Sequence, residues 1–164
     1  MNAADLQKFC AAPDDIREGM RQPWSRGKYT YATNGYILLR VARLGDVPEN
    51  ERAPDAAWMI AKIEPPSYWM PVPPATMPPD VKCDECDGTG VIEGEGPDDD
   101  SIDCEWCGHT GMMRKRIGVA VADAFFDQGY LSMIQGWKIA PNGFKPAWIR
   151  SGNIIGLLMP MTRQ

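Results

Sequence analysis

The sequence predicts an α+β domain that carries a small cysteine-rich insertion. Runs of alternating apolar and polar residues flank tight-turn dipeptides, a pattern typical of antiparallel hairpins. These dipeptides are Asn34-Gly35, Asn142-Gly143 and Gly152-Asn153. Helical apolar spacing precedes the hairpins at residues 2–12 and 122–137. Between these two halves, four of the five cysteines form two Cys-x-x-Cys pairs, which indicates a separate small lobe.

The composition is that of an ordinary globular domain. With 164 residues, 44% of them hydrophobic and 24% charged, the chain is long enough for one domain with its own core. No apolar run approaches the roughly 18 residues that cross a membrane, and the N-terminus lacks the pattern of a secretory signal. We therefore expect a cytoplasmic protein without a membrane partner. Its formal charge of −5 argues against a generic nucleic-acid coat but leaves a local basic face open.

The N-terminal half is expected to form a helix followed by a hairpin. Asn2 can cap a helix over residues 2–12, and Pro13 ends that helix. Residues 14–20 are expected to form one further, separate helical turn. Alternation then begins, and a hairpin over residues 28–42 is expected with its turn at Asn34-Gly35. A polar loop follows this hairpin.

The stretch between the hairpin and the cysteines contains two short segments of different character. Residues 58–63, WMIAKI, form either a short helix or a strand, and so few residues do not decide between them. Residues 64–80 contain seven prolines, which exclude regular helix and predict an extended segment. This segment is either a stiff connector or a ligand for a proline-binding module.

The two Cys-x-x-Cys pairs predict a zinc site. Each pair places two thiolates on one side of a tight turn, and two such turns complete the tetrahedral sulfur cage that Zn²⁺ prefers. Glycines after each pair allow the positive φ angles that the turns need. We therefore expect residues 81–111 to form a four-cysteine zinc knuckle with one structural Zn²⁺, held by Cys83, Cys86, Cys104 and Cys107.

Other interpretations of this region remain open at this stage. Two disulfides would need an oxidising compartment, and thioredoxin-like redox chemistry would need an adjacent βαβ pattern. His109 is the only histidine and competes with the thiolates as a ligand, although a turn residue is the simpler interpretation. Cys10 lies apart from the pairs and is expected to be a small buried apolar residue. The acidic stretch 93–103 is expected to be a solvated hairpin tip, with a calcium loop as the alternative.

The C-terminal half is expected to follow the order β-α-β-β-β. A strand is predicted over residues 112–122 and a helix over 122–137, with Gly136 as its C-cap. The side chains expected on the buried face of this helix are Phe125, Tyr130, Leu131 and Ile134. Three strands are then predicted at residues 137–141, 145–151 and 153–161.

The N-terminal half looks like a shortened version of the same unit. We therefore predict one α+β domain made of residues 1–80 and 112–164, built from two helix-plus-antiparallel-sheet halves and interrupted by the zinc-binding insertion at 81–111.

The cysteine stretch resembles the cysteine-rich domain of DnaJ-type chaperones, whose repeat is C-x-x-C-x-G-x-G. Cys83, Cys86, Gly88 and Gly90 match this repeat fully, whereas in the second copy His109 stands where the first glycine belongs. The family domain has four repeats and two zinc ions, so two repeats here imply one zinc. The HPD tripeptide of the J-domain is absent from the sequence, so the resemblance supports a metal site rather than recruitment of the family's partner chaperone.

The rest of the chain resembles one domain of the sliding clamp, the β subunit of bacterial DNA polymerase III. Residues 32–36, ATNGY, are similar to the clamp's A-T-D-G-H hairpin, and residues 158–163, LMPMTR, are similar to its terminal M-P-M-R. In that family the terminal motif helps to line a groove that takes partner peptides. The resemblance implies such a groove at Thr33, Gly35, Met159, Pro160 and Met161. A clamp subunit has three such domains and this chain has room for one, so a ring would require a homo-oligomer or a partner.

No catalytic constellation is present in the sequence, so we expect a protein that is not an enzyme. Two functions are considered. The first is a DNA- or replication-associated binding protein of bacteriophage or mobile-element type, with basic candidates Arg114, Lys115, Arg116, Lys138, Lys145 and Arg150. The second is a protein-interaction module or chaperone-like adaptor, in which the zinc lobe or the aromatics Trp69 and Trp106 contact a protein partner.

Overall fold

A seven-stranded antiparallel sheet forms the centre of the molecule. The computed structural model describes residues 1–93 and 101–162. The strands lie in the order β1-β2-β3-β13-β12-β11-β4, so the sheet combines strands from both sides of the cysteine stretch. Their bounds are Trp24–Arg26, Tyr29–Thr33, Ile37–Ala42, Ile154–Leu158, Lys145–Ser151, Lys138–Asn142 and Met70–Pro71.

Each half of the chain contributes three consecutive antiparallel strands to this sheet. In the N-terminal half β1, β2 and β3 follow the helix α1 (Ala3–Gln7), and in the C-terminal half β11, β12 and β13 follow the helix α3 (Gln128–Met133). The two sets join where β13 pairs with β3, from Ile155↔Arg40 to Leu158↔Ile37. The predicted hairpin over 28–42 is confirmed, and β1 is a strand that the polar pattern before residue 28 did not reveal.

The first helix is capped as expected but is shorter than predicted. The Asn2 side chain accepts a hydrogen bond from the Asp5 amide at 2.9 Å, and the Asp5 carboxylate accepts one from the Asn2 amide at 3.2 Å. This reciprocal capping box satisfies two amides that the first helical turn leaves free. The helix ends at Gln7 rather than at residue 12, and a 3₁₀ helix, η1 (Glu18–Met20), provides the further turn.

Residues 58–63, which the sequence left undecided, belong largely to a helix. This helix, α2, spans Ala56–Ala61, and the Asp55 side chain caps it by accepting a hydrogen bond from the Trp58 amide at 3.0 Å. Residues 64–80 contain no helix, as their prolines predict, and only β4 within them joins the large sheet.

The predicted helix over 122–137 is wrong in its first half. Residues Ala124–Asp127 form a strand, β10, that pairs with β9 (Gly118–Val121). The helix α3 begins only after Asp127, whose carboxylate accepts a hydrogen bond from the Gly129 amide at 2.8 Å and so fixes the start of the helix. Because residues in β10 alternate between faces, Phe126 is fully buried and Phe125 is only half-buried, while Leu131 and Ile134 are buried as expected.

The predicted strand over 112–122 is also divided. It consists of β8 (Met112–Arg114) and β9, separated by residues 115–117. The two parts have different partners, because β8 pairs with β5 (Asp80–Lys82) and β9 pairs with β10. The change of partner explains the break in the strand.

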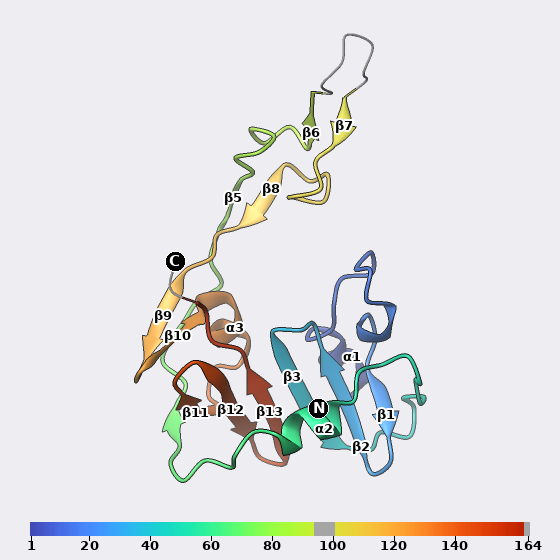
Figure 1. The fold of residues 1–164 in the computed structure, drawn as a ribbon, viewed down its shortest axis with the longest axis vertical. Helices are drawn as coiled ribbons and strands as arrows, with labels where there is room; N and C mark the ends of the chain where they lie inside the picture. Colours follow the sequence, from blue (N-terminus) through green and yellow to red (C-terminus); the bar gives the residue numbers. More distant parts are fainter. Residues whose placement is uncertain (94–100, 163–164) are drawn as a thin grey trace.

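Both faces of the large sheet are covered by apolar side chains. Alternation along β3 sends Leu39 into one cluster with α1 and α3, and Leu38 into another with α2. In Figure 1, α2 lies in front of the sheet and α1 and α3 lie behind it. In β12, Trp148 faces the α2 cluster, whereas its neighbours Ala147 and Ile149 face the opposite cluster. The sheet is therefore the middle layer of a packed structure.

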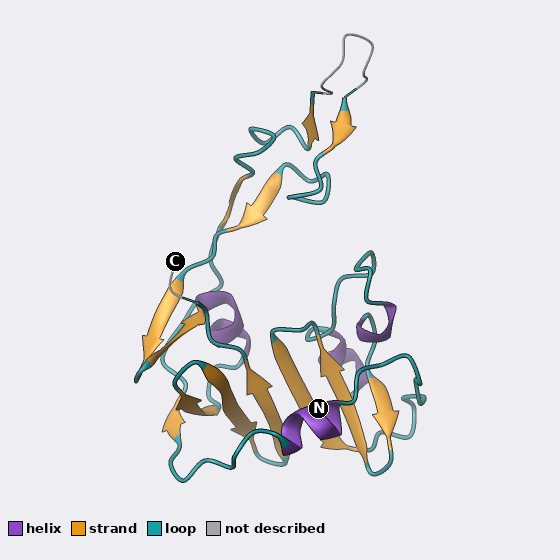
Figure 2. Cartoon of the chain, viewed as in Figure 1, coloured by secondary structure: helices purple, strands orange, loops and turns teal. Residues whose placement is uncertain are grey.

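The cysteine stretch projects from this layered structure as a narrow arm of short strands (Figure 2). The strands β5 and β8 run antiparallel at its base, and β6 (Val91–Ile92) pairs with β7 (Ile102–Asp103) farther out. We call residues 81–111 the cysteine lobe and the remaining described residues the body. The proposed hairpin tip or calcium loop at 93–103 lies mostly in residues 94–100, outside the described residues.

Strand makes up 34% of the residues that the structure describes and helix 13%, which is compatible with the predicted α+β class or with a mainly β class. Among the residues that the structure describes, no helix has the length and apolar character needed to cross a membrane.

Candidate metal centre and apolar groove

The four predicted cysteines form one compact cluster between the β5–β8 pair and the β6–β7 pair of the lobe. Their sulfur atoms all lie within 4.8 Å of one another. The Sγ atoms of Cys83 and Cys104 are 3.8 Å apart, and those of Cys86 and Cys107 are 3.7 Å apart. A tetrahedral site with metal–sulfur bonds of about 2.3 Å requires sulfur atoms about 3.8 Å apart. These two pairs match this spacing and the whole cluster is compact enough to hold a metal ion, and all five cysteines are free of disulfides.

The two Cys-x-x-Cys turns have nearly the same backbone structure. The Gly90 amide donates to Cys86 Sγ at 3.2 Å, and the Gly111 amide donates to Cys107 Sγ at 3.2 Å. The turns also bond to each other, because the Cys104 amide donates to the Gly90 carbonyl at 2.9 Å and the Cys83 amide donates to the Gly111 carbonyl at 2.9 Å. Each turn thus stabilises the other around the four sulfur atoms.

His109 occupies the position of a glycine in the second turn. Its φ of 68° corresponds to the φ of 82° at Gly88, and its amide donates to the Cys104 carbonyl as the Gly88 amide donates to the Cys83 carbonyl. The imidazole Nδ1 lies 3.1 Å from Asp103 Oδ2, on the surface of the lobe. His109 is therefore a turn residue and not one of the clustered ligands.

Burial and amide hydrogen bonds act against each other on the thiols. Burial raises the pKa of the Cys86 thiol, but the Gly90 amide and the neighbouring thiols lower that pKa to about 7 overall. Burial raises the pKa of the Cys104 thiol to about 11. Such a cluster keeps some protons until a cation replaces them, since thiolates packed this closely repel one another.

The cysteine lobe is strongly acidic. Residues 83–111 contain ten of the 22 acidic residues and none of the 17 basic residues, which leaves 17 basic against 12 acidic residues in the rest of the chain. Four thiolates with one divalent metal ion would add two further negative charges. A surface of this charge repels phosphate groups, so the lobe is not suited to contact a nucleic-acid backbone.

The six basic candidates do not form one face. Arg114, Lys115 and Arg116 lie where the lobe joins the body, and the Arg116 guanidinium is 3.2 Å from the Asp127 carboxylate. Lys138 and Arg150 lie opposite each other on β11 and β12, where Arg150 stacks over the Trp69 ring at 4.2 Å. Lys145 begins β12, five residues before Arg150, which is about 17 Å along a strand.

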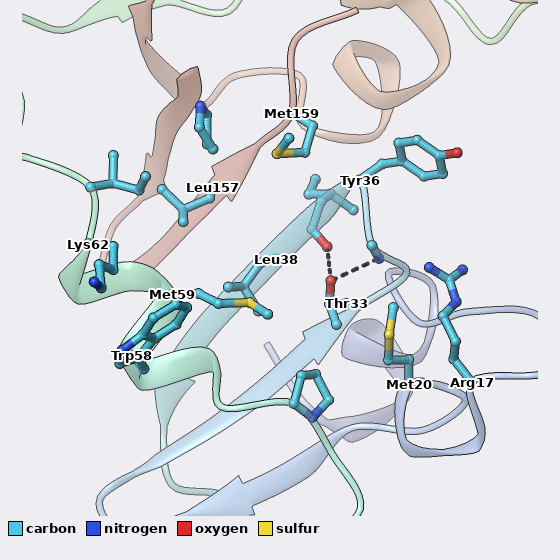
Figure 3. Close-up of a pocket in the computed structure, with 15 residues that line it drawn as sticks. Arg17, Met20, Thr33, Tyr36, Leu38, Trp58, Met59, Lys62, Leu157 and Met159 are labelled. Carbon is cyan, nitrogen blue, oxygen red and sulfur yellow. Dashed lines mark hydrogen bonds between the residues drawn. The ribbon is translucent and has the colours of Figure 1, made fainter. Parts of the chain in front are cut away.

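An apolar groove of about 580 Å³ lies on the α2 face of the body (Figure 3). Leu38 and Leu157, which are direct partners across β3 and β13, line it together with residues of α2. Three of the five predicted groove residues line it: Thr33, Gly35 and Met159. Pro160 and Met161 are not among its lining residues, and the Met161 amide donates instead to the Phe125 carbonyl at 2.7 Å.

The turn between β2 and β3 is fixed by side chains that form hydrogen bonds with backbone groups of the same turn. Thr33 Oγ1 donates to the Ile37 carbonyl at 2.7 Å and accepts from the Gly35 amide at 3.1 Å. Asn34 Oδ1 accepts from the amides of Tyr36 and Ile37 at 3.0 and 3.2 Å. The Met159 amide donates to the Tyr36 carbonyl at 2.8 Å, so the C-terminal segment is attached directly to this turn. Two distant sequence segments therefore form one wall of the groove.

The opposite wall of the groove is formed by residues that were not predicted from the sequence. Trp58, Met59 and Lys62 of the α2 region line the groove, and Arg17 and Met20 of the η1 region complete its end. The sequence has no motif that marks these residues; in the structure the side chains of Trp58 and Met59 are 59% and 41% exposed. The predicted contact residue Trp106 is 69% exposed on the lobe, whereas Trp69 is packed against the α2 cluster.

No protein-family model, curated protein or solved structure matches the chain. The functional inferences below therefore depend on the cysteine cluster and the groove.

Proposed function

We propose that this protein is a non-enzymatic, zinc-containing binding protein whose body takes an extended peptide segment of a partner protein. The observation that carries this proposal is the groove, where the β2–β3 turn, the end of β13 and α2 expose apolar side chains around one open cavity. A peptide ligand suits such a site because it fills an elongated apolar groove with successive side chains.

The composition of the groove supports a flexible apolar ligand. Met159 and Met59 are 42% and 41% exposed, and the unbranched methionine side chain adjusts to partners of different shape. Trp58 adds a large exposed ring of the type that often dominates binding energy. Exposed apolar groups of this size, gathered in one place, are typical of interaction sites.

The resemblance to the sliding clamp supports the same ligand class. It implies a peptide groove at five positions, and three of these, Thr33, Gly35 and Met159, line one cavity. We also propose that the body has the fold of one clamp-like domain. A replication-associated partner is consistent with it, whereas direct DNA contact is less well supported, because the six basic candidates of the described residues are spread over the lobe junction and both ends of β12.

We propose that the cysteine cluster binds one structural Zn²⁺. Four sulfur donors within 4.8 Å of one another suit zinc, and a site closed by four thiolates leaves no position for water or substrate. Purified protein should contain one zinc per chain by elemental analysis, and Cys104→Ser should lower this content to near zero. A cobalt-substituted protein without the absorption of a tetrahedral thiolate site would contradict the assignment.

A direct titration tests the peptide proposal. The probes are fluorescein-labelled decapeptides with Leu, Met or Phe at alternate positions, and the readout is fluorescence anisotropy. We expect saturable binding by the wild-type chain and at least about a tenfold loss for Met159→Glu, because the new carboxylate would lie in an apolar site. The matched control is Met112→Glu, since Met112 is 43% exposed on the lobe side and Met159 is 42% exposed in the groove. Equal binding by both variants, or no binding by the wild type, would refute the groove as a peptide site.

A further inference from the structure

The charged residues that line the groove are of one sign. Among its lining residues, Arg17 and Lys62 are basic and none is an aspartate or a glutamate, although the whole chain has 22 acidic and 17 basic residues. Figure 3 shows the two basic side chains at opposite ends of the groove, with the apolar residues between them. A ligand that fills the apolar middle therefore has a basic group near each of its ends.

Arg17 is held in place by groups that lie outside the groove. Its Nε and Nη2 donate to the two Asp15 carboxylate oxygens at 2.9 and 2.7 Å, and Nη2 also donates to the Asn34 carbonyl at 3.2 Å. Hydrogen bonding to Arg17 holds the pKa of Asp15 well below its usual range, so the pair persists across the neutral pH range. These contacts leave Nη1, which lies against Gly35, with its two N–H donors available at the end of the groove.

Lys62 provides the unpaired charge. Its ammonium lies 4.8 Å from the centre of the Trp58 ring, and none of the ion pairs found in the described residues includes it. The ring holds the ammonium beside the apolar surface without neutralising it. A carboxylate bound there would contact an unpaired positive charge at the edge of an apolar groove, a partly exposed ion pair of modest strength.

We propose that the groove selects acidic peptides, in which apolar side chains fill the middle and carboxylates next to them bind Lys62 and the Nη1 donors of Arg17. This inference depends on the proposed peptide-binding function and adds the chemistry of the partner segment to it. Lys62 and Arg17 then determine specificity, while the apolar residues between them supply most of the affinity.

Three matched peptides test this proposal. They share the same apolar residues and carry Asp and Glu, Asn and Gln, or only Lys at the flanking positions, and binding is measured by fluorescence anisotropy at low and high salt. We expect the acidic peptide to bind roughly three- to tenfold more tightly than the amide peptide, as two partly exposed ion pairs predict, and the lysine peptide to bind most weakly. Added salt should weaken the acidic peptide most.

Variants assign the effect to named residues. Lys62→Met should reduce the preference for the acidic over the amide peptide while the amide peptide still binds. The addition of Arg17→Gln to this variant should reduce the preference further. Lys28→Met is the matched control, because Lys28 is exposed between β1 and β2 and does not line the groove. Equal binding of all three peptides to the wild type would overturn the charge selection and leave the proposed function standing. An unchanged preference in Lys62→Met would likewise overturn it, whereas failure of every peptide to bind would overturn both proposals.

Discussion

The body and the cysteine lobe are each stabilised by different interactions. In the body, strands with alternating burial place large apolar side chains in two clusters on the two faces of the sheet. In the described part of the lobe, the buried cluster consists of three cysteines, with Ile92, Cys107 and Met113 packed against it. Hydrophobic burial scales with apolar area, so it stabilises the body and contributes little to the lobe. We therefore expect the lobe, and not the body, to depend on a bound metal ion.

The two regions also differ in charge and in their inferred function. The lobe has no lysine or arginine between residues 83 and 111, whereas the groove of the body is lined by basic and apolar residues. We infer that the body carries the binding function and that the lobe is an independently stabilised attachment.

The largest expected effect is the unfolding of the lobe on removal of zinc. Structural zinc on thiolates contributes on the order of 10 kcal/mol or more, which exceeds anything else the lobe can supply. A strong chelator, or Cys104→Ser, should make residues 81–111 sensitive to a protease while most of the circular dichroism of the body remains. Limited proteolysis with mass spectrometry measures this. A lobe that stays resistant without zinc would contradict the account.

The reverse change should weaken the body and leave the lobe intact. Leu39 is fully buried in the cluster that contains α1 and α3, so Leu39→Ala should lower the free energy of unfolding of the body by about 2–5 kcal/mol. Urea denaturation followed by circular dichroism measures this loss. The zinc content in the absence of urea should stay at one per chain, and a simultaneous loss of zinc would show that the two regions fold as one unit.

A smaller effect is expected from a pair of glycines with positive φ. A side chain at Gly90, where φ is 82°, would collide with the His109 carbonyl across the two cysteine turns, whereas Gly27, at φ 59°, has open space around it. Left-handed backbone costs an ordinary residue about 1–2 kcal/mol, so Gly90→Ala should lower zinc affinity about tenfold or more. Gly27→Ala should leave zinc affinity unchanged. Competition with a chromophoric chelator measures both affinities.

The smallest expected effect concerns the cysteine outside the cluster. Burial raises the pKa of the Cys10 thiol to about 12, so at pH 8 only about one molecule in 10,000 carries the reactive thiolate. Iodoacetamide should add no group to the zinc-loaded chain and four groups to the chelated chain, as counted by mass spectrometry. A fifth rapid adduct on the chelated, folded chain would show that Cys10 is more accessible than its packing indicates.

Local chemistry explains which parts of the fold were predictable. The Asn34-Gly35 turn, the Asn2 cap and the cysteine turns depend on residues that are neighbours in sequence, and all three appear as expected. The segment 122–127 was predicted as helix because its apolar residues also fit a helical period. Pairing of β9 with β10 decides its structure, and pairing between strands is not encoded in one segment alone.

The same distinction applies to the groove. Thr33, Gly35 and Met159 were predicted from a resemblance of short motifs, whereas Trp58 and Lys62 were not, because only the packing of α2 on the sheet brings them to the same cavity. The six basic candidates do not all share one surface for a similar reason, although Lys138 and Arg150 are partners across β11 and β12. Arg150 and Lys145 share β12 but lie near its opposite ends, and sequence proximity along a strand does not produce a common surface.

Hydrogen exchange with mass spectrometry tests the separation of the two regions most directly. The measurement compares the zinc-loaded and chelated chain, each with and without a groove-binding peptide. Chelation should speed exchange in the described part of residues 81–111 and leave the strands of the large sheet protected. The peptide should protect residues 33–38 and 56–63 whether or not zinc is bound. Loss of protection throughout the sheet on chelation, or peptide protection confined to the lobe, would contradict the account.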